Sequence, residues 1–333
     1  MKLFRLLCLV FSLLAISVPV VASPQAPHPA PALRRGINIL GYDPIWRDAG
    51  QGRFKEKHFR AIREAGFDFV RVNLQAFRYM NASGELDRKW LDRLDWVVRG
   101  ASQAGLAVIL DEHDFDTCSK DPAICRIMLG NFWKQVAPRY RASPASVMFE
   151  LLNEPHDKLD ADGWNQLLVE MLAIVRRTNP TRTVVIGPTR WNSADELPSL
   201  RLPDSDRNIL VTFHYYEPFR FTHQGASWTA MVAVHGIPWG SDEDRARLAA
   251  DFARVAAWSR ANRRPVLLGE FGAYDKGGTP IALRAAYDSS VAREAEKQGL
   301  PWAYWQFDSD FVAYDIAKDE WVPPIRDALI PRP

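Results

Sequence analysis

The stretch VMFELLNEPH (residues 147–156) is the part of the sequence from which the fold can be worked out. It begins with apolar residues that suit a strand buried on both faces, as in a parallel sheet. Asn153 and Glu154 follow, and Pro155 ends the strand because proline cannot donate a ladder hydrogen bond. A carboxyl group in this place is either the first solvated residue after the core or part of a site, and the rest of the chain decides between the two.

Seven further segments share this apolar character and are separated by amphipathic stretches of helical periodicity. The predicted strands are 34–40, 67–74, 106–113, 147–153, 183–189, 208–216, 265–272 and 301–307, and the predicted helices include 55–65, 87–104, 162–177, 243–261 and 280–298. This alternation predicts an α/β fold of the (β/α)8 TIM barrel type. A doubly wound open sheet would need a glycine-rich phosphate turn after its first strand, and GINILGYDP (36–44) contains none.

The N-terminus has the features of a secretory signal. Residues 1–22 combine Lys2 and Arg5 with an apolar run and a small-residue cleavage motif, which predicts a secreted protein, extracellular or periplasmic. Residues 23–33 are a Pro/Ala-rich spacer, and 34–333 should form one domain, since no second spacer or repeat follows. No later segment is apolar over a transmembrane length, so no membrane association is expected after cleavage.

Charge limits the classes of partner. When Lys2 and Arg5 are removed from the 42 basic residues, 40 remain, equal to the 40 acidic residues. A net charge near zero argues against nucleic acid or another polyanion as the partner. A monomer is expected.

Three cysteines are present, and Cys8 leaves with the signal. Cys118 and Cys125, in CSKDPAIC, predict a disulfide that pins a loop in an exported protein. No Cys-x-x-Cys spacing accompanies them, and DEHDFD (111–116) fits neither an EF-hand loop nor a His-x-x-x-His zinc motif. No metal and no cofactor are therefore expected.

Polar residues follow the apolar part of several predicted strands, and barrel enzymes build their sites at this end. They are Arg71, Asp111 to Asp114, Asn153 and Glu154, His214 to Tyr216, Glu270 and Trp305. A charge inside an apolar strand is costly unless it is paired. We therefore expect Arg71 to pair with Glu270.

Glu154 and Glu270 end the fourth and seventh strands, so they should face each other across the barrel mouth. Glycoside cleavage needs one protonated and one ionised carboxyl group. Arg71 and the phenol of Tyr216 would keep Glu270 ionised, whereas burial and the charge of Glu270 would raise the pKa of Glu154. Glu270 is thus the expected nucleophile and Glu154 the expected acid and base.

The motifs VRVNL, ILDEHD, NEP, FHYYEP, GEFG and WAYWQFD, in this order, resemble glycoside hydrolase family 5 over nearly the whole chain after the spacer. The resemblance implies a retaining catalytic domain with Glu154 as acid/base and Glu270 as nucleophile. It also implies sugar-site roles for Arg71, His113, Asn153, His214, Tyr216 and Trp305. HYYEPFRFTHQGASW (214–228) is similar to bacterial endo-β-1,4-glucanases, some of which accept mannans, and this adds His223 and Trp228 beside the sugar cleft.

Two features depart from the family pattern. His113 is followed by Asp114, where many members have a second histidine, and GYDPIW (41–46) replaces the usual Asn/Glu-bearing loop. Both changes concern the glycone side of the cleft, so a β-mannanase or a mixed-linkage glucan or xyloglucan hydrolase stays an alternative to a cellulase. A non-catalytic glycan-binding barrel is the second class of function, and the presence of both glutamates favours the enzyme. Trp191, Trp228 and Trp305 come from different loops and predict an open cleft that cuts internal bonds.

Overall fold

A computed structural model describes residues 33–331, and its core is a closed barrel of eight parallel strands in sequence order. The (β/α)8 prediction is therefore confirmed. The strands are β1 (Arg35–Ile39), β2 (Phe69–Leu74), β3 (Ala107–Glu112), β4 (Val147–Glu150), β5 (Val184–Ile186), β6 (Ile209–Tyr215), β7 (Val266–Phe271) and β8 (Trp302–Tyr304). Each lies within a segment predicted from the sequence. The signal peptide (1–22) and all of the spacer except Leu33 lie outside the described residues.

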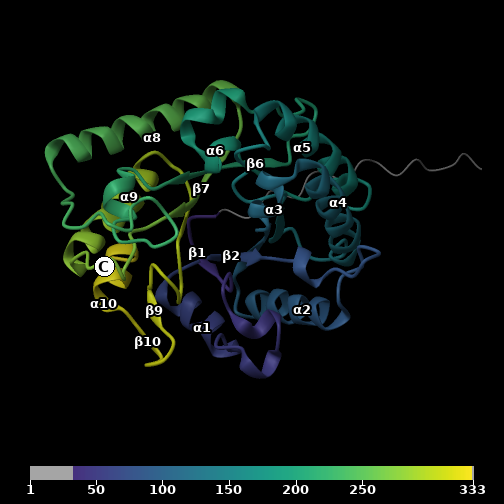
Figure 1. Ribbon diagram of the computed structural model, residues 1–333, viewed down its shortest axis with the longest axis horizontal. Coiled ribbons are helices and arrows are strands. Elements are labelled where there is room, and N and C mark those ends of the chain that lie inside the picture. Colours follow the sequence, from purple (N-terminus) through teal and green to yellow (C-terminus); the bar gives the residue numbers. More distant parts are fainter. Residues whose placement is uncertain (1–32, 332–333) are drawn as a thin grey trace, which may run out of the picture.

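Helices surround the barrel, as Figure 1 shows. They are α1 (Glu56–Ala65), α2 (Arg88–Gln103), α3 (Phe115–Lys120), α4 (Pro122–Arg139), α5 (Ala161–Arg176), α6 (Thr189–Asn192), α7 (Phe219–Thr222), α8 (Asp242–Asn262), α9 (Ile281–Lys297) and α10 (Pro323–Leu329). Short 3-10 turns are η1 (Pro44–Trp46), η2 (Ala49–Gln51), η3 (Phe77–Tyr79) and η4 (Ala194–Ser199), and β9 (Tyr314–Asp315) pairs with β10 (Glu320–Trp321) in a hairpin. No helix among residues 33–331 is long and apolar enough to cross a membrane.

The predicted disulfide is present between Cys118 and Cys125, whose Cα atoms are 4.6 Å apart. The loop expected around it is wrong, because Cys118 lies in α3 and Cys125 lies in α4. The Asp121–Pro122 pair between the two cysteines begins a helix instead of lying in a loop. Asp121 accepts hydrogen bonds from the amides of residues 123 and 124, and Pro122 occupies the first helical position, where its missing N–H costs nothing.

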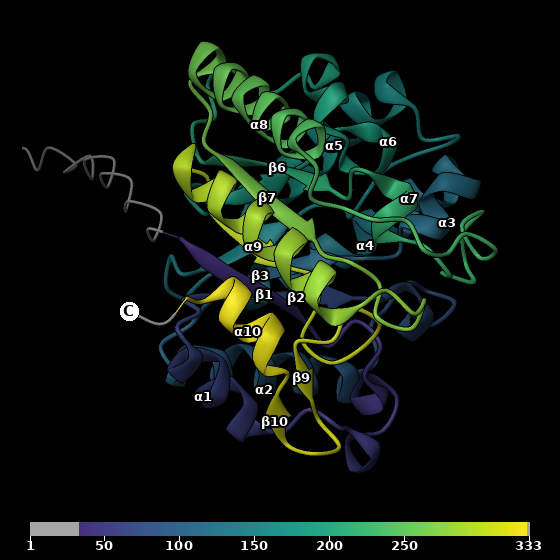
Figure 2. The same ribbon diagram turned by 90° about the vertical axis from the view of Figure 1, so that its left-hand side faces the viewer.

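The barrel interior changes from apolar to charged along the strands. Near the strand starts it is filled by Phe69, Ala107, Ile109, Met148, Val185, Leu210, Leu267 and Ala303. Residues i and i+2 of a strand face the same side. The inward position therefore passes, two residues later, from Phe69 to Arg71, from Ile109 to Asp111 and from Met148 to Glu150. This polar layer lies between the apolar layer and the carboxyl ends of the strands. The loops that follow these strand ends lie at the right of Figure 2.

Arg71 is the cation of this layer, and its side chain is fully buried. Its Nε and Nη2 donate to the two oxygens of Glu150 at 2.7 and 2.9 Å. Nη1 donates to Glu270 Oε1 at 2.7 Å, so the predicted pair is confirmed. Nη2 also lies 3.1 Å from Asp111 Oδ2 and donates to Asn153 Oδ1 at 2.7 Å. One guanidinium thus joins carboxyl groups from β3, β4 and β7.

Replacing Arg71 by methionine should lower the free energy of unfolding by about 3–5 kcal/mol at neutral pH, because three buried carboxyl groups lose their cation. Arg71 holds the pKa of Asp111 below its usual range although burial alone would raise it. This stabilisation is present above the ordinary pKa of an aspartate, about 4, and is lost only as the pH falls below it. The difference between the proteins should therefore be smaller at about pH 2 than at neutral pH.

Urea unfolding at both pH values measures this difference. Arg141→Ala is a suitable control because Arg141 is exposed just before β4, and its loss should change stability by less than about 0.5 kcal/mol. An Arg71→Met protein as stable as the wild type at neutral pH would contradict the role assigned to Arg71.

Candidate active site

Glu270 is held by two donors at the end of β7. Its Oε1 accepts from Arg71, and its Oε2 accepts from the Tyr216 hydroxyl at 2.9 Å, as the sequence predicted. A β-bulge between Phe213 and His214 shifts the register so that His214 lies opposite Glu270. The bulge therefore brings the imidazole of β6 beside the carboxyl group of β7.

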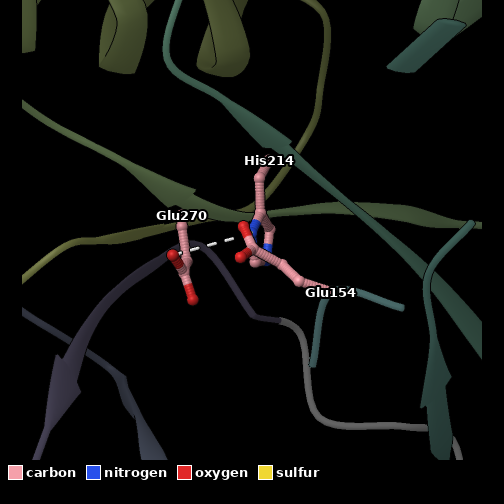
Figure 3. A group of neighbouring side chains, drawn as sticks. All are labelled: Glu154, His214 and Glu270. Carbon is pink, nitrogen blue, oxygen red and sulfur yellow. Dashed lines mark hydrogen bonds and ion pairs between the residues drawn. The ribbon is translucent and has the colours of Figure 1, made fainter. Parts of the chain in front are cut away.

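Glu154 lies four residues beyond the end of β4, in a left-handed backbone conformation with φ of 41°. Such a conformation is strained for a residue other than glycine and is often found at functional sites. Its carboxyl group faces His214, with Oε1 2.6 Å from His214 Nδ1 (Figure 3). Burial raises the pKa of Glu154 to about 7, and the nearby charges of His113 and Arg71 only partly oppose this shift.

His214 is kept neutral and fixed in orientation. Burial lowers its pKa to about 3. The side-chain amide of Asn192 donates to its Nε2 at 3.2 Å, so Nδ1 carries the ring hydrogen and donates to Glu154 Oε1. The remaining oxygen of Glu154 is therefore the one that can carry a proton.

Two glycines make this arrangement possible by close approach. A Cβ at Gly269 would lie 3.0 Å from His214 Nε2 and 2.5 Å from Thr212 Oγ1. A Cβ at Gly187 would lie 2.2 Å from Asn192 Oδ1. Any larger residue at either position would push the imidazole or its supporting amide out of place.

Glu154, His214 and Glu270 each offer a ligand atom within 4.8 Å of the others. Two carboxylates and an imidazole could in principle bind a divalent cation. Here, however, Glu270 already accepts from Arg71 and Tyr216, and His214 Nδ1 is bonded to Glu154. A cation at this point would lie close to the Arg71 guanidinium, so the donor set suits proton transfer better than metal binding. The absence of a metal stays a prediction.

His113 and Trp305 form one wall of the site. Their rings stack with centroids 5.5 Å apart and planes 6° apart. His113 Nδ1 is 2.6 Å from Asp111 Oδ2, and its Nε2 is 3.4 Å from Asn153 Nδ2. Burial alone would lower the pKa of His113, but Asp111 outweighs it and raises the pKa. The amide of Asn153 is thereby fixed between Arg71 and His113.

The other predicted sugar-site residues lie farther along the barrel mouth. Trp191 is 49% exposed and stacks on His156, with ring centroids 4.5 Å apart. Trp228 is 54% exposed and meets His223 edge-on at 6.5 Å. His223 itself is buried against Tyr216, so it supports this wall from behind.

Several residues of the site were not predicted. Glu150 carries the same signal that identified Arg71, a charge inside an apolar strand, and could have been found. His156 Nδ1 donates to the Glu154 carbonyl oxygen, 2.7 Å away, and the His156 ring stacks against Trp191. Asn192 lies in a left-handed turn (190–192) that contains no glycine and gave no signal. Tyr42, in the unusual loop after β1, packs edge-on against Trp305 at 6.3 Å.

Comparison with known proteins agrees with this geometry. The chain matches the family model described as Cellulase (glycosyl hydrolase family 5) over residues 35–310. Endoglucanase H of Acetivibrio thermocellus is 30% identical over 320 aligned residues, which cover 90% of this chain and 33% of that protein. Endoglucanase 3 of Fibrobacter succinogenes is 26% identical over 342 residues, which cover 86% of this chain and 51% of that protein. The chain thus spans only a third to a half of the length of these curated relatives.

Solved structures share the whole barrel. Cel5A of Thermotoga maritima in complex with cellobiose has a TM-score of 0.85 at 37% identity, covering 90% of this chain and 98% of that chain. The same protein in complex with mannotriose gives a TM-score of 0.85 at 36% identity with the same coverage. From the family model, the matching barrel and the residues gathered at its mouth, the chain belongs to the cellulase family, glycosyl hydrolase family 5.

Proposed function

We propose that the protein is a secreted, retaining endo-β-1,4-glucanase that hydrolyses internal bonds of β-1,4-glucan by double displacement. This proposal rests on the different environments of two neighbouring carboxyl groups. Glu270 accepts from a cation and a phenol, whereas the pKa of Glu154 is raised to about 7 by burial. Oxygens of the two groups within 4.8 Å suit the short separation, about 5–5.5 Å between carboxyl groups, of glycosidases that use a carboxylate nucleophile.

In the first step, Glu270 attacks the anomeric carbon and forms a glycosyl ester. Glu154 gives its proton to the leaving oxygen, using the oxygen that His214 does not occupy. Arg71 donates to one oxygen of the attacking carboxylate and Tyr216 donates to the other, so the two hydrogen bonds together fix its orientation.

In the second step, Glu154 acts as base towards a water molecule. Formation of the ester removes the negative charge of Glu270. Water then attacks from the face that the leaving group vacated, and its proton passes to Glu154. Two inversions return the β configuration. Asn153, fixed by Arg71 and His113, is in place to bond the 2-hydroxyl group of the reacting sugar.

The cellulose preference is supported by the relatives named endoglucanase and by the cellobiose complex of the Thermotoga protein. A β-mannan is the second candidate, because the same Thermotoga protein has been solved with mannotriose. The exposed rings of Trp191 and Trp228 support an open cleft and therefore internal cleavage. Secretion rests on the signal predicted at residues 1–22, and the monomeric state is part of the same proposal.

Glu270→Gln should abolish turnover of every glycan, because an amide cannot form the glycosyl ester. A 2-deoxy-2-fluoro cellobioside with a good leaving group should inactivate the wild type, and peptide mass mapping should find the label on Glu270. Glu217→Gln, on the exposed segment after β6, is the matched control and should stay active. A label on another residue would overturn the assignment, and full activity of Glu270→Gln would exclude this mechanism altogether.

The kcat/KM for cello-oligosaccharides should fall as the pH rises through about 7, because Glu154 loses the proton that the leaving group needs. A 2,4-dinitrophenyl cellobioside serves as the control, since its leaving group departs without a proton. Its pH profile should lack this basic limb. The same limb with both substrates would assign the titration to another group.

A further inference from the structure

The loop that departs from the family pattern forms a hollow of its own. A cavity of about 480 Å³ lies over the segments that follow β1 and β2, and its lining includes Tyr42, Pro44, Arg47, Gln75, Arg78 and Tyr79. A second hollow of about 540 Å³ adjoins it and shares Arg78 and Tyr79. The two together form a groove along this side of the barrel mouth.

Tyr42 connects this groove to the catalytic centre. It lines the cavity, is 52% exposed, and packs edge-on against Trp305. Burial of its hydroxyl raises the pKa of Tyr42, and the negative charges of Glu270, Asp310 and Glu154 raise it further. The Tyr42 hydroxyl therefore lies within electrostatic reach of both candidate catalytic acids.

The far end of the cavity is positively charged. Arg47 and Arg78 are exposed, and within residues 33–331 neither guanidinium forms an ion pair or a side-chain hydrogen bond. Burial raises the pKa of the Tyr79 phenol, and the charges of Arg78, Arg47 and Arg93 oppose that shift, which places all three guanidinium groups near one hydroxyl. Asp114 is the acid that acts on the same hydroxyl.

The carboxylates that line this groove have partners other than Arg47 and Arg78. In the second hollow, Glu85 accepts from the Asn81 side chain at 3.0 Å, and Asp87 accepts from the backbone amide of residue 90 at 2.8 Å. Asp43 accepts from the backbone amides of residues 45, 53 and 54 and lies 3.9 Å from Arg53 Nε. Asp114 Oδ2 accepts from the backbone amide of residue 77 at 2.7 Å. The net charge of the chain is near zero, yet its distribution leaves unpaired positive charge here.

The direction of the cleft follows from the two acids. The leaving group lies on the side of Glu154. On this side His156 donates to the Glu154 carbonyl oxygen and stacks against the Trp191 ring. Trp305 directly follows β8 and Tyr42 lies in the loop after β1, and these neighbouring strands lie across the barrel from β4, which leads to Glu154 and His156. The groove therefore continues the glycone side of the cleft.

We propose that Arg47 and Arg78, with Gln75 and Tyr79, form a glycone-side subsite for a carboxylate-bearing sugar, so that the enzyme prefers β-glucans in which some units carry a uronate group. The planar guanidinium group is suited to paired hydrogen bonds with a carboxylate. This inference rests on the proposed function of the cleft, but its binding test does not require turnover.

The test compares two soluble β-1,4-glucan oligosaccharide mixtures of matched length, one neutral and one partly oxidised to the carboxylate at C6. Affinity is measured by calorimetry in the Glu270→Gln background, so that no hydrolysis occurs. The oxidised mixture should bind at least about tenfold more tightly, as expected for charge-assisted hydrogen bonds. Added salt should reduce this preference, because both arginines are exposed.

Arg47→Ala with Arg78→Ala, in the same background, should bring the two affinities together while leaving the neutral affinity unchanged. Arg47→Lys with Arg78→Lys should keep part of the preference. Arg141→Ala with Arg260→Ala removes the same charge from exposed positions before β4 and β7 and should keep all of it. Equal affinities in the starting background, or an unchanged preference after both alanine substitutions, would overturn the subsite. Failure of the wild type to hydrolyse either mixture would instead contradict the proposed function.

Discussion

The buried guanidinium of Arg71 is the interaction on which the rest of the site depends. It contacts Asp111, Glu150 and Glu270, which come from three different strands, and it also bonds Asn153 just before Glu154. A barrel can carry such a group because its inward positions pass from an apolar layer to a polar one within two residues of each strand. Without the cation, three carboxyl groups could not remain together in the interior.

The same arrangement gives the two catalytic candidates opposite properties. Glu270 lies at the edge of the Arg71 cluster and accepts from the Tyr216 hydroxyl. Glu154 lies beyond the end of its strand, where burial raises its pKa and His214 occupies one of its oxygens. His214 depends in turn on Asn192 and on the space left by Gly269 and Gly187. The chemistry therefore follows from where each carboxyl group stands relative to a single buried cation.

The sequence was sufficient for features that are local to one segment. Apolar runs located the eight strands, and the polar residues at their ends identified Glu154, Glu270 and the Arg71 partner. Register across strands is a long-range property, so the pairing of Asp111 with Glu150 could not be read from either segment. The left-handed turn at 190–192 contains no glycine, so its backbone conformation could not be predicted from the sequence. The Asp121–Pro122 pair was compatible with both a turn and a helix start, and the structure shows that Asp121 caps α4, which packs against α5.

The double-displacement mechanism is the central claim, and the anomeric form of the first product tests it most directly. Proton NMR of a cello-oligosaccharide digest, recorded before mutarotation, distinguishes the two anomers. Attack by Glu270 followed by attack of water predicts that the β-anomer appears first and that the α-anomer grows in only by mutarotation. An α-anomer that appears first would mean that water attacks directly and that Glu270 is not the nucleophile.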